Sequence, residues 1–296
     1  MPQHDLSRHA VIIASMGRPD ILRDTLASLS DQVARPGLII LSVTSDEDLP
    51  EGLDASRVKV VVVGKGLPVQ RNAGIDQLAD DIEYVSFLDD DVELDPRYLE
   101  TVHDFLAGNA GHVLVDGFVV IDDNVSRAEA KVALSEPHLV SGRIANSINA
   151  YGCNMTVRRA VVDLVRFDER LKLHAWLEDA DFSRRCLEHG LCAQVFDARL
   201  VHLRSPSARI SGRRHGFAQL TNSYYLKSKG QMSMAGLLLD HWAPALFSNA
   251  WGAFFGRSAN IDRAGRLQGN IIAIKRIFRK GCEPEYVEFI DVIPLK

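Results

Sequence analysis

Short apolar runs alternate with amphipathic stretches in the first third of the chain. Four apolar runs of strand length occupy residues 10–15, 38–43, 58–63 and 84–88. The third is apolar almost throughout, as in strands that are covered on both faces. Pro19 begins a helical pattern with one apolar stripe, and Pro68 begins a second that runs to about Ala79. This alternation predicts a doubly wound, mostly parallel α/β sheet.

The pattern is less regular after residue 110. Further strands are predicted at 112–121, 151–157 and 193–196, and helices at 159–165 and 178–189. Residues 122–140 are polar and predict a loop, whereas the chain from about Gly216 has a helical pattern to its end. We therefore predict a main domain at 1–215, with halves at about 1–115 and 116–215, and a C-terminal helical region at 216–296.

Composition narrows the functional classes. With 296 residues, 46% of them hydrophobic, the chain can form one large domain or two closely packed halves. A net charge of -5 gives no sign of nucleic-acid binding, and the four cysteines have neither metal-site spacing nor a disulfide framework. Residues 1–5 lack signal-peptide character, so we expect no signal peptide, and no apolar run reaches the ~20 residues that span a bilayer. We expect a cytoplasmic protein.

Three consecutive carboxylates, Asp89, Asp90 and Asp91, follow the apolar run at 84–88. On a strand, residues two apart share a face, so Asp89 and Asp91 point one way and Asp90 the other. Ligands of open α/β sheets bind beyond the carboxyl ends of the strands, and paired carboxylates there suit Mg2+ or Mn2+ with a diphosphate. The alternative is an acidic turn that opens a helix at Asp95-Pro96.

A second acidic cluster, Glu178-Asp179-Ala180-Asp181, lies at a predicted helix start. The helix dipole favours carboxylates there, so ordinary capping explains one or two of them. Three acids in four residues exceed what capping requires, and a carboxylate here can act as a general base toward an acceptor hydroxyl.

Two more positions have ligand chemistry. His202 follows a predicted strand, and imidazole is an acceptable Mn2+ ligand that can complete a site begun by Asp91. Otherwise it is an ordinary surface or core histidine. Arg71, in the segment Arg71-Asn72-Ala73-Gly74, can fork onto phosphate or base oxygens, unless this segment is simply part of an amphipathic helix.

Taken in order, these motifs resemble the family-two glycosyltransferases, which adopt the GT-A fold. The resemblance covers roughly Val11 to His202. The segment 11–19 is similar to the family's nucleotide-binding start, with Ser15 and Arg18 at its Thr and Arg and Met16-Gly17 where Tyr-Asn is common. Asp46 falls where the family has an acidic residue that contacts the base, although the usual Asp-Asp-Gly-Ser is absent.

The central motifs carry the rest of the resemblance. Segment 70–74 is similar to the family's Arg-Asn-x-Gly, segment 87–91 to its Asp-x-Asp motif, and segment 152–155 to the small-residue strand beside the donor sugar. The resemblance implies a nucleotide-sugar site made of Ser15, Arg18, Asp46, Arg71, Asn72, Asp89, Asp90, Asn154 and Glu178. It also implies Asp91, Asp89 and His202 as metal ligands and Asp179 as the catalytic base.

The implied activity is metal-dependent inverting glycosyl transfer. With Mn2+ or Mg2+ as cofactor, a sugar would pass from a nucleotide-sugar donor to a hydroxyl of a saccharide or lipid-linked acceptor, in polysaccharide or glycoconjugate synthesis. The main domain would be the GT-A catalytic domain, with a nucleotide-binding half followed by an acceptor half.

Three other functions use similar residues. A sugar-phosphate nucleotidyltransferase also uses paired acids, but its Gly-rich basic loop is not matched by Ser15-Met16-Gly17-Arg18-Pro19. A phosphatase with an Asp-x-Asp nucleophile needs a nearby Thr, which Asp91-Val92-Glu93 does not supply. A non-catalytic sugar-binding relative has no need of a base such as Asp179.

Basic residues lie beside apolar positions in the C-terminal region. They are Arg213, Arg214, Lys227, Lys229 and the run 275–280. This arrangement predicts either peripheral contact with an anionic membrane, at the inner face of the plasma membrane, or a solvated basic helix that closes the domain or forms a homo-oligomer.

Overall fold

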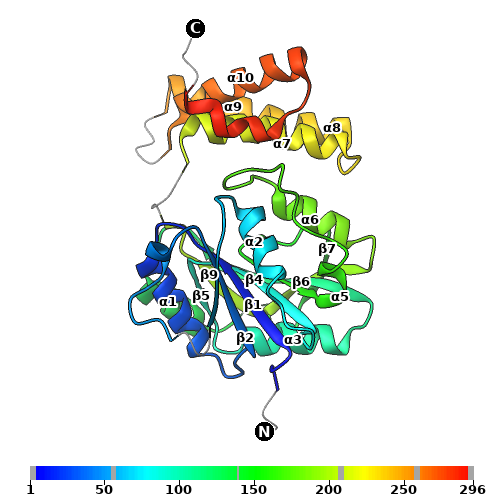
Figure 1. Cartoon of the computed structure of the whole chain (residues 1–296). Helices are drawn as coiled ribbons and strands as arrows, with labels where there is room; N and C mark the ends of the chain where they lie inside the picture. The colour runs from blue at the N-terminus through cyan, green and yellow to red at the C-terminus, as the bar shows by residue number, and fades with distance from the viewer. Residues whose placement is uncertain (1–4, 55–57, 139, 206–209, 257–260, 293–296) are drawn as a thin grey trace. The chain divides into compact units, whose positions relative to one another are not determined.

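The computed structural model describes residues 5–54, 58–138, 140–205, 210–256 and 261–292 (Figure 1). The chain forms two compact units. The first comprises Met1–Lys65, Val69–Phe167 and Phe182–Ala208, and the second comprises Gly66–Pro68, Asp168–Asp181 and Arg209–Lys296. The predicted domain boundary at residue 215 stays a prediction.

Nine strands among the described residues form one sheet in the first unit, in the order β3-β2-β1-β4-β8-β6-β9-β5, with β7 paired to β9. They are β1 (His9–Ala14), β2 (Leu38–Val43), β3 (Val58–Val62), β4 (Tyr84–Asp89), β5 (Val92–Leu94), β6 (His112–Asp122), β7 (Ile144–Ser147), β8 (Asn154–Arg158) and β9 (Leu191–His202). Strands β3, β2, β1 and β4 are parallel, whereas β8 is antiparallel to both β4 and β6. The predicted α/β class is confirmed.

Helices cover both faces of this sheet (Figure 1). They are α1 (Pro19–Ser30), α2 (Leu67–Ile75), α3 (Tyr98–Gly108), α4 (Arg127–Ser135), α5 (Arg159–Val162) and α6 (Glu178–Cys186). Along β1, Val11 and Ile13 enter the apolar cluster that contains residues of α1 and α3. The alternate residues Ala10 and Ile12 enter the cluster with residues of α2, α5 and α6. The period-two alternation of strand side chains thus gives the sheet two cores, as a doubly wound fold requires.

Strand β3 differs from its sequence prediction. It lies at the edge of the sheet, and its side chains are only partly covered, with Val62 52% exposed. The expectation of a strand buried on both faces was wrong because an apolar run does not distinguish an edge strand from a central one.

Residues 122–140 contain a helix where the sequence predicted a loop. Helix α4 begins after Ser126, whose hydroxyl accepts a hydrogen bond from the Glu129 amide while the Glu129 carboxylate accepts one from the Ser126 amide. This reciprocal pair is a capping box, a sequence signature that the polar composition concealed.

Strand β9 is longer than the predicted 193–196 segment. Its pairing with β6 shifts register at three places, so the side-chain alternation is interrupted and only part of the strand has a recognisable pattern. The described helices α2 and α5 end at Ile75 and Val162, earlier than the sequence predicted, and the helix expected at Asp95 begins at Tyr98.

The second unit is helical, as predicted from Gly216 onward. Its described elements are α7 (Gly212–Ser228), α8 (Met234–Gly236), the π-helix η2 (Leu237–Trp242), α9 (Ala243–Phe254), α10 (Arg263–Lys280) and the 3-10 helix η3 (Pro284–Val292). Phe217 and Leu220 of α7, Ala273 of α10 and Ile290 of η3 share its main apolar cluster. Helices α7 and α10 approach so closely that a Cβ on Gly269 would lie 2.1 Å from the Arg213 carbonyl oxygen. Within the described residues, we find no helix with both the length and the apolar character to cross a membrane.

Candidate functional site

The ends of four strands bring distant polar residues together in the first unit. Strand β1 lies between β2 and β4, so the chain goes from β1 to β2 on one side and returns from β3 to β4 on the other. Ala14 of β1 lies in register with Asp89 of β4. Such a switch point at the carboxyl ends of parallel strands is where α/β sheets bind ligands. The turn after β4 leads into β5, which pairs antiparallel with β9 and sets Val92 opposite His202. Strand β6 sets Asp122 opposite the same histidine.

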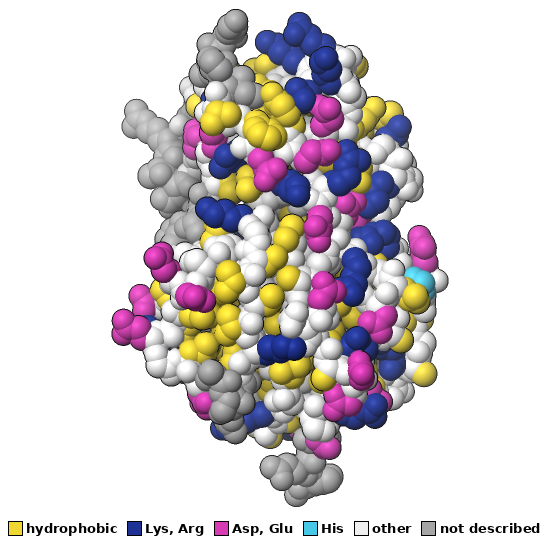
Figure 2. Space-filling model, in the orientation of Figure 1, with side chains coloured by type: hydrophobic (Ala, Val, Ile, Leu, Met, Phe, Trp, Pro, Cys, Tyr) yellow, Lys and Arg dark blue, Asp and Glu magenta, His cyan; other side chains and the backbone are white. Residues whose placement is uncertain are grey.

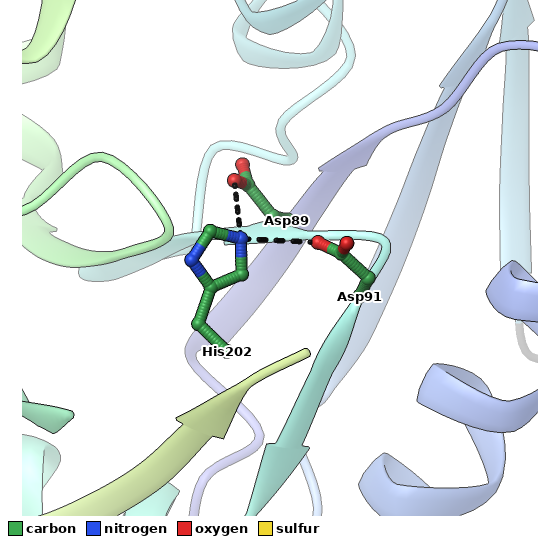
Figure 3. Close-up of side chains that lie close together, drawn as sticks. All are labelled: Asp89, Asp91 and His202. Carbon is green, nitrogen blue, oxygen red and sulfur yellow. Dashed lines mark ion pairs between the residues drawn. The ribbon is translucent and has the colours of Figure 1, made fainter. Parts of the chain in front are cut away.

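Asp89, Asp91 and His202 form a compact cluster there (Figure 3). Each offers a ligand atom, and these atoms lie within 4.8 Å of one another. The His202 Nε2 atom is 3.2 Å from Asp91 Oδ1 and 3.8 Å from Asp89 Oδ2. Two carboxylates and one imidazole are ligands that suit Mn2+, so the three residues predicted as metal ligands are brought together in a geometry that can hold a divalent cation.

In the metal cluster, the positive charge of protonated His202 offsets the negative charges of Asp89 and Asp91. Burial alone would lower the pKa of His202, but hydrogen bonds to Asp122 and Asp91 and the charge of Asp89 raise this pKa to about 10. Burial also opposes ionisation of Asp91, yet His202, Arg18 and the Ser205 amide hold the pKa of Asp91 below its ordinary value. A cation that binds at His202 Nε2 must displace this proton.

Asp122 orients the histidine and was missed in the sequence. Its Oδ1 atom lies 2.9 Å from His202 Nδ1, and the same oxygen accepts a 2.6 Å hydrogen bond from Arg204 Nε. Tyr151 Oη is 3.1 Å from the other carboxylate oxygen. A carboxylate on the second nitrogen of a ligating histidine fixes the ring and its tautomer. The available signal was that Asp122 and His202 end two strands, but their pairing could not be inferred.

Asp90 has a different position from its neighbours. It is fully buried, and its carboxylate accepts hydrogen bonds from Ser15 Oγ (2.6 Å) and Arg18 Nε (3.0 Å). Burial raises the pKa of Asp90 to about 7, although Arg18 and Ser15 oppose that shift. Ser15 and Arg18, predicted to contact the nucleotide, are thus bonded to the middle acid of the triad, and the Arg18 guanidinium also lies 3.6 Å from Asp91.

Besides Asp122, a carboxylate in the loop after β2, that of Asp48, was missed in the sequence analysis. Asp48 is buried and accepts hydrogen bonds from the Gly17 amide (2.6 Å) and the Thr44 amide (2.8 Å). It therefore ties the loop after β1 to the loop after β2. Asp46, the residue predicted to contact the base, is exposed two positions earlier. Gln70 also bridges these strands, because its amide donates to the carbonyl oxygens of Ser15 and Ser42.

Arg71 is buried beside the metal cluster. One of its terminal nitrogens donates to Asp89 Oδ1 (3.1 Å) and to the Gly152 carbonyl oxygen (2.6 Å), and its guanidinium lies 5.2 Å from the centre of the Phe167 ring. Asn72 exchanges two 2.9 Å hydrogen bonds with the backbone of Phe167. Arg71 thus reaches the cluster, whereas Asn72 joins α2 to the segment after α5.

Asn154 lies at the start of β8 and is fully buried. Its Oδ1 atom accepts hydrogen bonds from the Gly117 amide (2.5 Å) and Tyr98 Oη (3.2 Å). These contacts join β8 to β6 and α3. A role at the nucleotide-sugar stays a prediction.

The second acidic cluster begins α6, and its three acids belong to the second unit. Asp181 is fully buried and bonded to the Lys229 ammonium and to Gln231 Nε2, the latter at 2.8 Å. Glu178 is buried, while Asp179 is partly exposed. Of the three carboxylates, Asp179 therefore has the most access to solvent.

The loop before this cluster has an unusual backbone. Leu173, Ala175 and Leu177 all have positive φ angles, between 48 and 70 degrees, which non-glycine residues seldom adopt. The loop is held by the Leu67 amide, which donates to the Leu173 carbonyl oxygen, and by Asn222 Nδ2, which donates to the Trp176 carbonyl oxygen. Such conformations persist where the surrounding structure fixes them, frequently beside functional sites.

Comparison with known proteins identifies the family. The sequence pattern of glycosyl transferase family 2 matches residues 10–165. The chain belongs to glycosyl transferase family 2. The match contains β1 to α5 with Asp89, Asp91 and Arg71, and it ends before Asp179 and His202. Membership makes this protein a glycosyltransferase and removes the nucleotidyltransferase and phosphatase alternatives. A search of curated proteins found no match.

Solved structures show that this family 2 glycosyltransferase has the GT-A fold. It is similar to GalNAc-T7 with UDP, GalNAc and Mn2+, at 16% identity and a TM-score of 0.51, over 67% of this chain and 44% of that one. It is also similar to S. aureus TarS 1–349, at 14% identity and a TM-score of 0.52, over 96% of this chain and 83% of that one. The chain thus spans less than half of the GalNAc-T7 chain. At these identities the likeness concerns the fold.

Proposed function

We propose that this glycosyltransferase is a metal-dependent, inverting enzyme that transfers a sugar from a nucleotide-sugar donor to an acceptor hydroxyl. The observation that carries the proposal is the cluster of Asp89, Asp91 and His202 at the switch point of the sheet. We further propose that the acceptor is a saccharide or a lipid-linked saccharide, in polysaccharide or glycoconjugate synthesis.

The donor set of the cluster fits a Mn2+ or Mg2+ ion. Two carboxylates would supply charge and the imidazole Nε2 would supply a nitrogen ligand that Mn2+ accepts more readily than Mg2+. The Mn2+ bound to GalNAc-T7 supports the same ion. A divalent cation at this site supplies charge neutralisation to a diphosphate leaving group.

Two arginines support recognition of the donor diphosphate. The guanidinium groups of Arg71 and Arg18 both reach the Asp triad, where they donate to Asp89 and Asp90 respectively. Because these carboxylates fix both side chains, their positions are set before a donor binds, which reduces the entropy lost on binding. Guanidinium groups match phosphate oxygens well.

The proposed reaction is a single displacement. Asp179 accepts the proton of the acceptor hydroxyl as the acceptor oxygen bonds to the anomeric carbon. The bond between that carbon and the diphosphate oxygen breaks, and the diphosphate leaves with the electron pair. Attack from the opposite face inverts the anomeric configuration, through a transition state with oxocarbenium character as in glycoside hydrolysis. The partial exposure of Asp179, in contrast to buried Asp181, supports this choice of base.

The test is release of nucleoside diphosphate from UDP-, dTDP- and GDP-sugars, with Mn2+, Mg2+ or EDTA and with saccharide and lipid-linked acceptors. We expect release from one donor, lost in EDTA and in Asp91→Ala and retained in Asp31→Ala, which removes an exposed acid of the first unit. Equal release with EDTA and in Asp91→Ala would contradict the metal assignment. Retained anomeric configuration in the product, read from its proton NMR coupling, would contradict inversion.

A further inference from the structure

The C-terminal unit has a continuous exposed apolar stripe. Six apolar residues recur every four positions from α8 through η2 and α9 to the residue after α9, and all six are exposed: Ala235, Leu239, Ala243, Phe247, Trp251 and Phe255. Leu239 and Phe247 are each 70% exposed, and Phe254 beside them is 75% exposed. Single exposed hydrophobics are normal, but a contiguous aromatic patch marks an interaction surface.

The aromatic end of this stripe forms one cluster. The ring centres of Trp251 and Phe255 are 4.8 Å apart, and those of Phe247 and Trp251 are 6.1 Å apart. The other side of α9 is fixed inward because buried Asn249 donates to Asn270 Oδ1 (2.8 Å) and to Gln219 Oε1 (3.0 Å). A rotation that hid the stripe would leave these buried amides unpaired, at a cost that keeps the stripe outward.

Positive charge accompanies the stripe. Residues 230–282 contain seven Lys and Arg against two Asp, although the whole chain has a net charge of -5. On α10, which packs against α9, Lys275, Arg279 and Lys280 are exposed together with Phe278. Figure 2 shows Lys and Arg side chains beside hydrophobic ones over the C-terminal helices. Other basic residues that the sequence analysis noted in the C-terminal region form ion pairs within the protein, such as Lys229 with Asp168 and Arg214 with Asp291.

We propose that the exposed faces of α9 and α10 dock this enzyme on an anionic lipid bilayer. Aromatic side chains would enter the headgroup region while Lys275, Arg279 and Lys280 contact lipid phosphates. A second copy of the chain fits less well, because a two-fold interface pairs the same patch on both copies and would bring the basic side chains of one copy near those of the other. This proposal of a docking surface does not depend on which nucleotide-sugar donor the enzyme uses. Its consequence, access to a lipid-linked acceptor, rests on the proposed function.

The experiment is co-sedimentation of the full chain with phosphatidylcholine vesicles, with or without about one-third phosphatidylglycerol. We expect binding to the anionic vesicles that weakens as salt is raised. The double variant Lys275→Glu/Arg279→Glu should bind at least about tenfold less, since each basic residue near an anionic surface contributes about fivefold. Trp251→Ser/Phe254→Ser should also lose at least about tenfold, because burial of one such ring is worth more than that.

Matched controls come from the first unit. Leu164→Ser removes an apolar side chain that is 70% exposed, and Lys65→Glu reverses an exposed basic residue. Both should bind vesicles as the unchanged protein does. All variants should release nucleoside diphosphate from the donor at the unchanged rate without lipid, so failure of docking is distinguished from failure of the proposed function.

Three results would overturn the proposal. The first is an absence of vesicle binding at low salt, with the protein folded by circular dichroism. The second is binding that both double variants retain. The third is a stable dimer in lipid-free buffer, measured by sedimentation velocity, for a protein that does not bind vesicles. If Trp251→Ser/Phe254→Ser dissociates this dimer, the apolar stripe is covered by a second copy of the chain.

Discussion

The two acidic clusters look alike in sequence, but the fold uses their carboxylates in opposite ways. In the triad after β4, the outer acids Asp89 and Asp91 face His202, and the middle acid Asp90 is buried with Ser15 and Arg18. At the start of α6, Asp181 is buried against Lys229, and the middle acid Asp179 is partly exposed. The partners of each carboxylate therefore decide its role: Asp90 and Asp181 are held in buried contacts, whereas Asp89, Asp91 and Asp179 are available for chemistry.

The difference follows from the local backbone. In the triad, only Asp89 belongs to strand β4, and Asp90 and Asp91 form the turn into β5. This turn brings Asp91 to the side of Asp89 and His202, while Asp90 points toward Ser15 and Arg18. The second cluster forms the first turn of a helix, where Glu178 and Asp181, three residues apart, share the buried face, and Asp179 points away from it. The comparison predicts that substitutions within each cluster will have sharply different effects.

The largest expected effect is on catalysis at Asp179. Asp179→Asn should leave donor affinity unchanged and reduce turnover about 10²–10⁴-fold, because a general base contributes that much. Turnover and donor affinity are measured by diphosphate release under saturating acceptor. Glu188→Gln, an exposed carboxamide substitution shortly after α6, is the control and should leave both unchanged. Unchanged turnover in Asp179→Asn would remove this residue from the role of base.

The next effect is on stability at Asp181. Asp181→Asn should lower the free energy of unfolding by about 2 kcal/mol, because the buried carboxylate that pairs with Lys229 is lost while Lys229 keeps Asp168 as a partner. Urea unfolding measures this loss. Asp179→Asn should change the unfolding free energy by less than about 0.5 kcal/mol, the usual range for a surface site. If the two variants unfold alike, the division of roles within the second cluster fails.

A smaller effect is expected at Asp122, which contacts His202 from the other side. Asp122→Asn should weaken Mn2+ affinity about 10–100-fold, as removal of a carboxylate that orients a ligating histidine does. Isothermal titration with Mn2+ measures it, and Asp123→Asn, an exposed neighbour, is the control. Affinity that stays the same in Asp122→Asn would show that His202 does not depend on this carboxylate.

The last prediction concerns pH and a second contrast within the sheet, between the buried histidine His9 and the histidine of the metal cluster, His202. Burial lowers the pKa of His9 to about 3, so His9 is neutral when folded and gains a proton only on unfolding. Below pH 6.5, the ordinary value, the unfolded state binds more protons, and stability falls by up to about 1.4 kcal/mol per pH unit until the folded pKa is reached.

Urea unfolding between pH 7 and pH 4 measures this slope, which His9→Phe should reduce by up to about 1.4 kcal/mol per pH unit. His189→Phe, at an exposed histidine, should not change it. An equal slope in His9→Phe would show that another group is responsible for the loss of stability in acid.

The central fold was accessible from the sequence because its signals are local. The runs that became β1, β2 and β4, and the Pro19 that starts α1, each carry a periodicity that needs no distant partner. The capping box of α4 was equally local and was overlooked. The edge position of β3 depends on strand order, which local patterns do not contain.

The candidate site was only partly accessible. The Asp-x-Asp pattern pointed to Asp89 and Asp91, and His202 was proposed beside them, but their approach depends on β5 pairing with β9 in one register. Asp122 and Asp48 were missed because each acts through residues far away in sequence. The partners of Ser15, Arg18 and Asn154 likewise lie far along the chain.

The most direct test of the account is a Mn2+ titration followed by electron paramagnetic resonance of the free ion. We predict one site per chain, lost in Asp91→Ala and in His202→Ala and preserved in Asp31→Ala. Equal occupancy of the site in all four proteins would contradict the assignment of Asp89, Asp91 and His202 as the metal centre of this glycosyltransferase.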